Sequence, residues 1–181
     1  KPVHIDMKPL SAVPKWGWED WMRDTKKSGA TPIDLSIHDI DFVQYVFGEP
    51  KLVNGVHRKL KNNSDYIVSN LIYDDFAVTV TGAWYSCDFK FTAEYTAVFE
   101  NGCVKCSNGE IIKNGEKIEI EIESVSEDTG INISGADGYL GELKYFIECM
   151  KQGVKPEKVT PESSEASVRL VERILENAIV L

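Results

Sequence analysis

Three polar side chains in one apolar segment have the types and spacing of an acid–base site. Asp34, His38 and Asp41 stand at positions i, i+4 and i+7, which places them on one face if the segment is a helix. A carboxylate beside an imidazole holds its tautomer and raises its basicity, as a general acid or base requires. Two alternatives remain open: a core or interface histidine with polar neighbours, and a metal site, although no third ligand is evident.

The segment that carries these residues has the pattern of a buried helix. Thr31 suits the N-cap position and Pro32 the first helical position. The helix is expected to run from Pro32 to Phe47 and to stop at Gly48. Buried carboxylates are unfavourable unless they are paired. Burial of this helix therefore favours a function for its polar face. Tyr45 extends that face. Apolar residues lie on most sides of the helix, which predicts that burial: Ile33, Leu35, Ile37, Ile40, Phe42, Val43, Val46 and Phe47.

The middle of the chain predicts an antiparallel sheet. Asn-Gly and related turns recur between segments rich in β-branched and aromatic residues, which is a hairpin signal. Residues 117–123 alternate strictly between charged and apolar side chains, as in a strand with one buried face. Pro9 and Pro14 are expected to break regular structure after the first strand. The expected strands are Val3–Met7, Lys51–Arg58, Asp65–Tyr73, Phe76–Ser86, Phe91–Glu100, Cys103–Ser107 and Glu116–Glu123.

Helices are expected before and after these strands. A short helix spans Glu19–Lys27 and is closed by Ser28 and Gly29. Two longer helices span Gly138–Gln152 and Pro161–Ala178. Helices that are segregated from a run of antiparallel strands indicate the α+β class. We therefore predict a single domain over residues 1–181, with an open-faced, predominantly antiparallel β-sheet and helices packed on one face.

Composition excludes several classes of function. The 181 residues carry a formal net charge of −9 without clustered Lys and Arg, so nucleic acid is not an expected partner. No apolar run is long enough to span a membrane, and the chain does not begin with a signal-peptide pattern, so a cytoplasmic protein is expected. Cys103 and Cys106 have the spacing of a zinc knuckle without a second pair, which predicts free thiols and no metal.

The stretch around the candidate site resembles a family signature. Residues 28–50 are Ser-Gly-Ala-Thr-Pro-Ile-Asp-Leu-Ser-Ile-His-Asp-Ile-Asp-Phe-Val-Gln-Tyr-Val-Phe-Gly-Glu-Pro. They are similar to the pattern Gly-Gly-x-x-x-Asp-x-x-x-His-x-x-Asp of the glucose–fructose oxidoreductase/inositol dehydrogenase/MocA family. In that family, a hydrophobic helix that ends in Gly-Glu-Pro comes after the pattern. Residues 99–102, 139–153 and 165–172 resemble later parts of the same family, so the likeness covers nearly the whole chain in the right order.

This resemblance implies a fold and an activity. Members of the family have an N-terminal Rossmann domain, which is absent from this chain, and a C-terminal α+β domain of the dihydrodipicolinate-reductase type with an open sheet. They transfer a hydride between a C–OH group of a sugar, polyol or cyclitol and the nicotinamide ring of NAD or NADP. The resemblance implies that His38 is the general acid/base and that Asp34 binds and orients the substrate. It assigns the cofactor to the Rossmann half, so no cofactor is expected on this chain.

The family's third catalytic member is a lysine in a Glu-Lys-Pro motif of the Rossmann half. Met7-Lys8-Pro9 is superficially similar, but it lies in the first expected strand. Lys8 is therefore expected to line the substrate pocket from the sheet edge. The glycines at 135, 138 and 141 do not follow the start of a βαβ unit, so they do not form a nucleotide fingerprint. Four weaker pocket candidates, for which plain packing is the alternative, are Asp41, Trp16, Phe89 and Phe91.

The open face of the sheet predicts self-association. Helices can cover only one face, and an exposed apolar face is usually an interface, so a homo-dimer or tetramer through this face is expected. A non-catalytic binding or oligomerisation module of the same fold is the alternative function, which the presence of both Asp34 and His38 disfavours. The free face is expected to carry either Val78 and Val80 or their alternates Ala77, Thr79 and Thr81, with aromatic residues such as Tyr95 or Phe91.

Overall fold

The computed structural model describes residues 1–107, 109–119 and 136–181. It divides into two compact units, residues 1–118 with 165–181, and residues 119–164. The candidate site lies entirely in the first unit.

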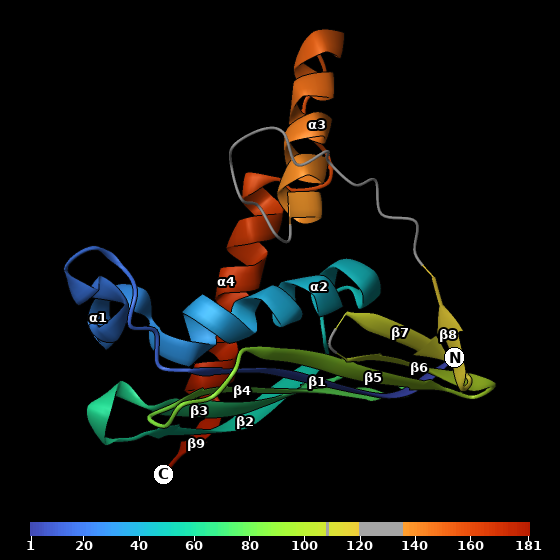
Figure 1. Ribbon diagram of the computed structural model, residues 1–181. Helices are drawn as coiled ribbons and strands as arrows, with labels where there is room; N and C mark the ends of the chain where they lie inside the picture. Colours follow the sequence, from blue (N-terminus) through green and yellow to red (C-terminus); the bar gives the residue numbers. More distant parts are fainter. Residues whose placement is uncertain (108, 120–135) are drawn as a thin grey trace. The chain divides into compact units, whose positions relative to one another are not determined.

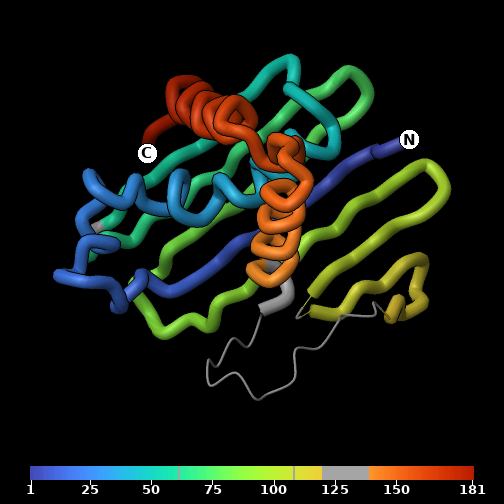
Figure 2. The backbone as a smooth tube through the Cα atoms, turned by 90° about the horizontal axis from the view of Figure 1, so that it is seen from above, coloured from blue at the N-terminus to red at the C-terminus, as the bar shows by residue number. Residues whose placement is uncertain are grey.

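One open sheet organises the first unit. Nine strands of the described residues follow the order β8-β7-β6-β5-β1-β4-β3-β2-β9 (Figures 1 and 2). The pairs β1–β4 and β2–β9 are parallel and the others are antiparallel, which confirms a mostly antiparallel α+β fold. The strands are β1 (Pro2–Ala12), β2 (Leu52–Lys59), β3 (Asp65–Ile72), β4 (Ala77–Tyr85), β5 (Thr92–Phe99), β6 (Gly102–Ser107), β7 (Glu110–Lys113), β8 (Glu116–Ile118) and β9 (Ala178–Val180).

Most strands agree with the sequence prediction to within about two residues, but the two ends of the sheet do not. The short strands β7 and β9 were not predicted, because three or four residues are too few for a period-2 pattern to be recognised. The predicted strand Glu116–Glu123 forms β8 only as far as Ile118, and residues 120–123 lie outside the described residues.

The expectation that Pro9 ends the first strand is wrong. Pro9 is buried inside β1 and pairs with Ala93 of the antiparallel neighbour β5. The parallel pairing with β4 is interrupted at this point, since the register passes from Met7–Val80 directly to Leu10–Ala83. A proline lacks the N–H that a ladder needs, and the interruption removes that need.

One face of the sheet is covered by helices α2 (Ile37–Phe47) and α4 (Pro161–Glu176) (Figure 2). Alternate strand residues point toward these helices, and each fully buried aliphatic side chain contributes about 1.5–3 kcal/mol to stability. Both helices are therefore fixed to the sheet through their apolar faces. The shared core consists of Ile5, Met7, Val53, Ile67, Leu71, Val78 and Val80 from the strands, Ile40 and Val43 from α2, and Leu170, Val171 and Ile174 from α4.

The predicted helix over Pro32–Phe47 has two parts. Residues Thr31–Ser36 form a π-helix, η2, and α2 follows from Ile37. The chain enters η2 through Ala30, which has a φ of 55° and is fully buried. A π-turn with i to i+5 hydrogen bonds is rare and occurs often at functional sites. The 3.6-residue pattern of the sequence does not reveal it, because the change of register lasts for only one turn.

Only part of the apolar surface predicted for this helix is buried. Ile40 and Val43 are in the core, and Ile33, Ile37 and Phe47 pack against it. Phe42 and Val46 are 52% and 48% exposed, so the expectation of a helix buried on most sides is wrong. The reason is that the sheet covers one side of the helix only, which leaves its outer face open in this chain.

Close approach of η2 to the sheet depends on Gly82 of β4. A Cβ atom at this position would lie 2.0 Å from Ser36 Oγ and 2.9 Å from Thr31 Cγ2, both in η2. Ser36 and Thr31 are fully buried, so neither side chain has room to move away. The glycine thus permits the contact that fixes the start of the site-bearing helix.

Replacing Gly82 by alanine is expected to destabilise the protein by about 1–3 kcal/mol, because overpacking forces neighbouring groups out of place. Urea unfolding of the two proteins measures the effect. Gly141→Ala is the matched control, since its Cβ would meet nothing within 4 Å and a helical Gly→Ala change is expected to be slightly stabilising. An equal effect of both substitutions would show that Gly82 does not provide a required contact.

The segment before η2 differs from the predicted helix Glu19–Lys27. It forms the 3-10 helix η1 (Trp18–Arg23) and the short helix α1 (Thr25–Ser28), which ends at Gly29 in the left-handed conformation as predicted. Glu19 and Asp20 both have positive φ angles, which a regular helix does not allow. A second small core holds this segment on the sheet and contains Val13, Met22, Ala30 and Trp84.

In the second unit, helix α3 spans Ala136–Gln152. Tyr145 Oη accepts hydrogen bonds from the backbone N–H groups of Glu157 and Lys158, and the ammonium group of Lys158 lies 4.9 Å from the centroid of the Tyr145 ring. Tyr145 therefore fastens the connection after α3 to the helix. Thr160 Oγ1 accepts from the N–H of Ser163, and the Thr160 N–H donates to Ser163 Oγ, so this pair of hydrogen bonds caps the start of the last helix.

Candidate functional site

His38 lies on the outer side of helix α2, beside two half-buried carboxyl groups. Its side chain is exposed, whereas Asp34 in η2 and Asp39 in α2 are each half-buried. The opposite side of the helix is fixed by Ile40 and Val43, which are each 1% exposed. The site residues thus stand on a helix whose rotation about its own axis is set by core packing.

The two carboxyl groups interact electrostatically with the imidazole. Burial raises the pKa of Asp34, and the nearby His38 partly opposes this change. Burial raises the pKa of Asp39 more strongly, to about 6, again against the influence of His38. Among the described residues, neither carboxyl group forms a hydrogen bond with His38. The arrangement is therefore an imidazole open to solvent, beside two carboxyl groups whose pKa values are raised by burial.

Asp39 was not predicted as a site residue. The spacing i, i+4 and i+7 marks the face of Asp34, His38 and Asp41, and Asp39 stands next to His38 but outside that spacing. The signal was present: Asp39 comes three residues after Ser36 and four before Val43, both buried, and residues three and four apart share one helix face. An acid at the border of a buried stripe is partly desolvated, and this explains its raised pKa.

Asp39→Asn is expected to stabilise the protein at pH 8 and to change stability little at pH 4. A carboxyl group whose folded pKa of about 6 exceeds its unfolded value of 3.8 supports the fold below the unfolded value, and this support is lost as the pH rises through 6. The gain at pH 8 is on the order of 1–3 kcal/mol, allowing for partial exposure. Thermal unfolding at both pH values measures it. Asp88→Asn, at an exposed loop position, is the control, and equal behaviour of the two variants would contradict the assignment.

Asp41, the third member of the predicted trio, is directed elsewhere. It is exposed, and its carboxylate accepts a hydrogen bond of 2.5 Å from Ser167 Oγ of α4. Ser167 Oγ also lies 3.1 Å from Gln44 Oε1. The structure therefore brings Asp34 and His38 together with Asp39, and it uses Asp41 to connect α2 with α4.

Lys8 is not brought to the site. Strand β1 lies in the middle of the sheet, between β4 and β5, and not at its edge. Its residues Ile5 and Met7 belong to the core beneath α2, so Lys8 points to the opposite face of the sheet. There Lys8 Nζ lies 2.9 Å from Asp6 Oδ2, and this hydrogen bond raises the pKa of Lys8, which keeps its ammonium group protonated.

The aromatic pocket candidates gather at one end of the sheet. Strand β1 ends at Ala12, which pairs with Tyr85 at the end of β4, so the loops that follow both strands leave the sheet together (Figure 1). Trp16 in the first loop is 70% exposed, and its neighbour Trp18, the first residue of η1, is 81% exposed. In the second loop, Phe91 is 60% exposed and Phe89 is 37% exposed, with its ring 4.8 Å from the ring of Tyr85. Helix η2 begins at this same end, since Thr31 lies close to Gly82 of β4.

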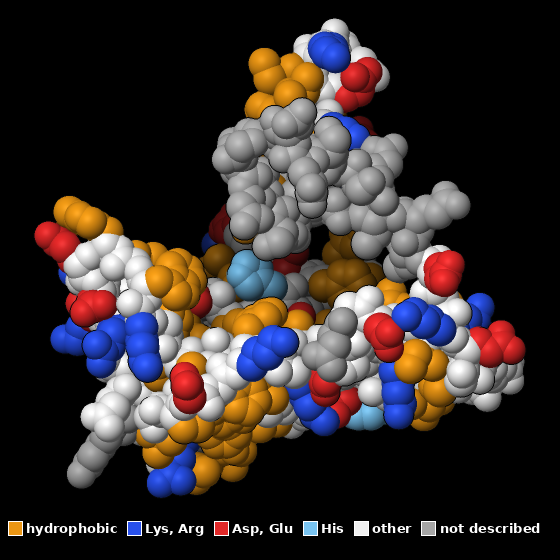
Figure 3. All heavy atoms as spheres, viewed as in Figure 1, with side chains coloured by type: hydrophobic (Ala, Val, Ile, Leu, Met, Phe, Trp, Pro, Cys, Tyr) orange, Lys and Arg blue, Asp and Glu red, His pale blue; other side chains and the backbone are white. Residues whose placement is uncertain are grey.

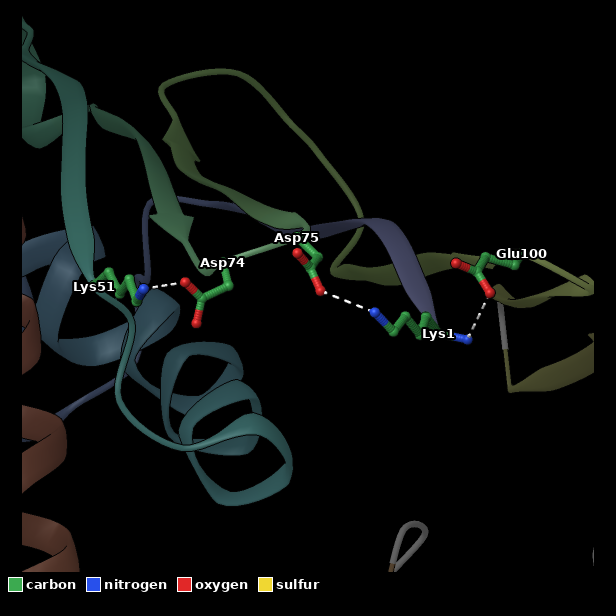
Figure 4. Close-up of polar contacts among 5 residues, drawn as sticks. All are labelled: Lys1, Lys51, Asp74, Asp75 and Glu100. Atoms are coloured by element: carbon green, nitrogen blue, oxygen red, sulfur yellow. Dashed lines mark hydrogen bonds and ion pairs between the residues drawn. The ribbon is translucent and has the colours of Figure 1, made fainter.

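A cavity of about 420 Å³ lies at the other end of α2. Its walls include the aromatic residues Phe47, Tyr73 and Phe76, and charged groups surround its opening. Lys51 pairs with Asp74, Lys1 Nζ lies 3.1 Å from Asp75, and the Lys1 amino group lies 3.7 Å from Glu100 (Figure 4). No residue of the predicted acid–base trio lines this cavity, so it is separate from the candidate site.

No group of three or more His, Cys, Asp or Glu side chains in the described part of the chain could hold a metal ion. None of the described helices is long and apolar enough to cross a membrane.

Comparison with known proteins places the chain in a family. Residues 2–178 match the model of an oxidoreductase family, C-terminal alpha/beta domain. Human trans-1,2-dihydrobenzene-1,2-diol dehydrogenase is 26% identical to the chain over 161 residues, which are 83% of this chain and 47% of that protein. The chain therefore spans about half the length of this relative.

Solved structures share the fold. Biliverdin reductase from Synechocystis sp. PCC 6803, in complex with biliverdin and NADP⁺, superposes with a TM-score of 0.74 at 12% identity, over 98% of this chain and 55% of that one. UDP-N-acetylglucosamine 3-dehydrogenase from Acidithiobacillus ferrooxidans gives 0.69 at 11% identity, over 98% and 53%. A 3-ketoreductase from Actinomadura kijaniata, in complex with NADP, gives 0.64 at 13% identity, over 100% and 53%. The chain belongs to the oxidoreductase family of glucose–fructose oxidoreductase, inositol dehydrogenase and MocA, and residues 2–178 are its C-terminal alpha/beta domain.

Proposed function

We propose that this chain is the substrate-binding half of a nicotinamide-dependent oxidoreductase. The enzyme acts on a hydroxyl group of a cyclic or open-chain substrate, with His38 as general acid/base. One observation carries the proposal: an exposed imidazole stands beside two half-buried carboxyl groups, on a helix held by the core. A base that is open to solvent can reach a substrate proton, and the fixed helix keeps it in place.

In the direction of oxidation, His38 accepts the proton of the substrate hydroxyl as the hydride leaves the same carbon. The C–H bond breaks with both of its electrons, the O–H bond gives its proton to the imidazole, and the carbonyl double bond forms. Asp34 lies in η2, which leads directly into α2, and orients the hydroxyl toward His38. NAD or NADP supplies the hydride acceptor. In the reverse direction, the imidazolium returns the proton to the carbonyl oxygen.

The cofactor is proposed to bind to a separate N-terminal Rossmann domain. Nucleotide phosphates commonly bind at open helix N-termini, but at the start of η2 the Thr31 N–H already donates to the Asp65 carboxylate. A carboxylate in this position would also repel a phosphate. This chain's part is therefore to bind the substrate and to move its proton.

The proposed substrates are sugars, polyols or cyclitols. The structural relatives named above include a dehydrogenase of a UDP-linked amino sugar and a 3-ketoreductase, and the relative in sequence is named for a cyclic diol. A panel of sugars, cyclitols and trans-dihydrodiols, incubated with the complete protein and NAD⁺ or NADP⁺, tests the proposal. Reduction of the nicotinamide by a member of the panel is the expected result.

All four cysteines are free thiols, which supports a cytoplasmic site of action.

We also propose that the chain self-associates through the open face of the sheet. The free face carries Ala77, Thr79 and Thr81, whereas Val78 and Val80 are buried and Tyr95 packs against the core. Hydrophobic side chains lie on this face (Figure 3), and Val56 pairs with Val68 there. A polar row crosses it, in which Asn70 donates to Asn54 and accepts from Thr79. The free face is thus more polar than the sequence predicts. Such a face suits an interface that buries a moderate area.

Light scattering is expected to give a mass above that of a single chain, 20.3 kDa. Val68→Lys places a charge in the middle of the free face and is expected to reduce the mass to that of one chain, because an unpaired charge in an interface is unfavourable. Phe42→Lys is the control on the helical side, where Phe42 is exposed, and is expected to leave the mass unchanged. A wild-type mass of one chain at every concentration would contradict the proposed contact.

A further inference from the structure

A buried carboxylate from the sheet holds the start of the helix that carries the candidate site. Asp65, the first residue of β3, is 1% exposed. Its Oδ2 accepts a hydrogen bond of 3.2 Å from the backbone N–H of Thr31, and its Oδ1 lies 2.8 Å from His57 Nε2. Both oxygens of the carboxylate are therefore occupied, one by the helix and one by a neighbouring strand.

Thr31 is the first residue of η2 and is fully buried. Besides its N–H bond to the Asp65 carboxylate, its Oγ1 donates to the Asp65 carbonyl oxygen at 3.3 Å. The first N–H groups of a helix lack partners within it, and negative charge is favourable at that end. Asp65 thus acts as an N-terminal cap supplied from a distant strand, because Ala30 before the helix provides no side-chain cap.

His57 in turn is held from both sides of its strand. It is 7% exposed and pairs with Ile67 of β3. On its other side it pairs with Val180 of β9, and its carbonyl oxygen accepts from the N–H of Leu181 at 3.0 Å. His57 cannot move away without disturbing two strand pairs, so it fixes the position of the Asp65 carboxylate.

We infer that Asp65, oriented by His57, is a positioning residue for the acid–base site: it sets where η2 begins, and so where Asp34 and His38 stand. Asp34 lies in the first turn after Thr31, and His38 follows in the next. The close approach at Gly82 fixes the same turn from the sheet side. This inference rests on the proposed function, because it acts through His38.

The test compares two replacements of His57 in the complete protein. Leucine removes the ring N–H that can donate to Asp65, whereas the glutamine amide can still donate. His57→Leu is expected to lower kcat about 10–100-fold, because a displacement of about 1 Å at the reacting groups has effects of this size. The KM for the nicotinamide is expected to stay unchanged, and His57→Gln is expected to restore most of the turnover. Tyr73→Phe is the matched control: it removes the 2.8 Å hydrogen bond to Gly48 at the far end of α2, and it is expected to lower the thermal midpoint without lowering kcat.

A double-mutant cycle separates positioning from a general loss of stability. In the His38→Ala background, His57→Leu is expected to have little further effect on turnover, since the group that it positions is gone. Wild-type turnover of folded His57→Leu, or the same fold-loss in both backgrounds, would overturn the inference. If His57→Leu does not fold, Asp65→Asn takes its place with the same two criteria. A His38→Ala protein with normal turnover would instead refute the proposed function, and this outcome is recognised from the single variant.

Discussion

Replacing His38 by alanine is expected to lower the kcat of the complete protein by about 10²–10⁴-fold, the usual contribution of a general acid or base. The affinity for NAD(P) should change little, because the imidazole stands on the substrate-binding half. His38 is exposed and the core side of its helix is formed by other residues, so the variant should fold as the wild type does.

Steady-state kinetics on a hydroxyl substrate measures this effect. His4→Ala is the control, since His4 is also exposed but lies on β1, one residue before the core residue Ile5 and therefore on the free face of the sheet. A His38→Ala variant that turns over nearly as fast as the wild type would contradict the role of His38 as general acid/base. A wild-type protein that turns over no hydroxyl substrate would favour the alternative function, a non-catalytic binding or oligomerisation module of the same fold.

Replacing Asp34 by asparagine is expected to change both the rate and its dependence on pH. The substitution keeps the shape of the side chain and removes its charge. Burial raises the pKa of the Asp34 carboxyl group, so removal of this ionisable group should change the acidic limb of the kcat/KM profile. Loss of substrate orientation should lower kcat/KM by up to about 100-fold.

The profile of kcat/KM against pH, measured for wild type and Asp34→Asn, distinguishes a charge effect from a structural one. Asp74→Asn is a control carboxylate at the other end of α2, and its profile should overlay that of the wild type. If Asp34→Asn lowers kcat/KM while the acidic limb of the profile stays at the same pH, Asp34 acts through contact with the substrate and not through its charge. If neither changes, Asp34 has no part in the reaction.

Much of the fold could be predicted from local patterns. The turns with Asn and Gly delimited five strands, and the 3.6-residue spacing of Ile33, Ile37, Ile40 and Val43 marked the face of the helix that packs on the sheet. These features depend on neighbouring residues only, and a sequence displays them directly. The parallel pairing of β1 with β4 joins strands that are distant in sequence, and no local pattern specifies it.

The candidate site was predicted in part. Asp34 and His38 share a helix, so their proximity follows from spacing. The roles of Asp39, Asp65 and Lys8 depend on tertiary structure: Asp39 on how far the helix is rotated into the core, Asp65 on a contact across 34 residues of sequence, and Lys8 on which face of β1 is buried. The side of β1 on which Lys8 lies could have been predicted from the sequence. Ile5 and Met7 are apolar and alternate with Asp6 and Lys8, which places Lys8 on the face opposite the core.

The most direct test of the central claim is chemical rescue of the His38→Ala variant by added imidazole. His38 is exposed, so a small base from solution can reach the position that the side chain leaves. We expect hydride transfer to the nicotinamide to recover in part as the imidazole concentration rises, and the His4→Ala control to be indifferent to imidazole. Turnover of His38→Ala at the wild-type rate without imidazole would contradict the claim that this side chain moves the substrate proton.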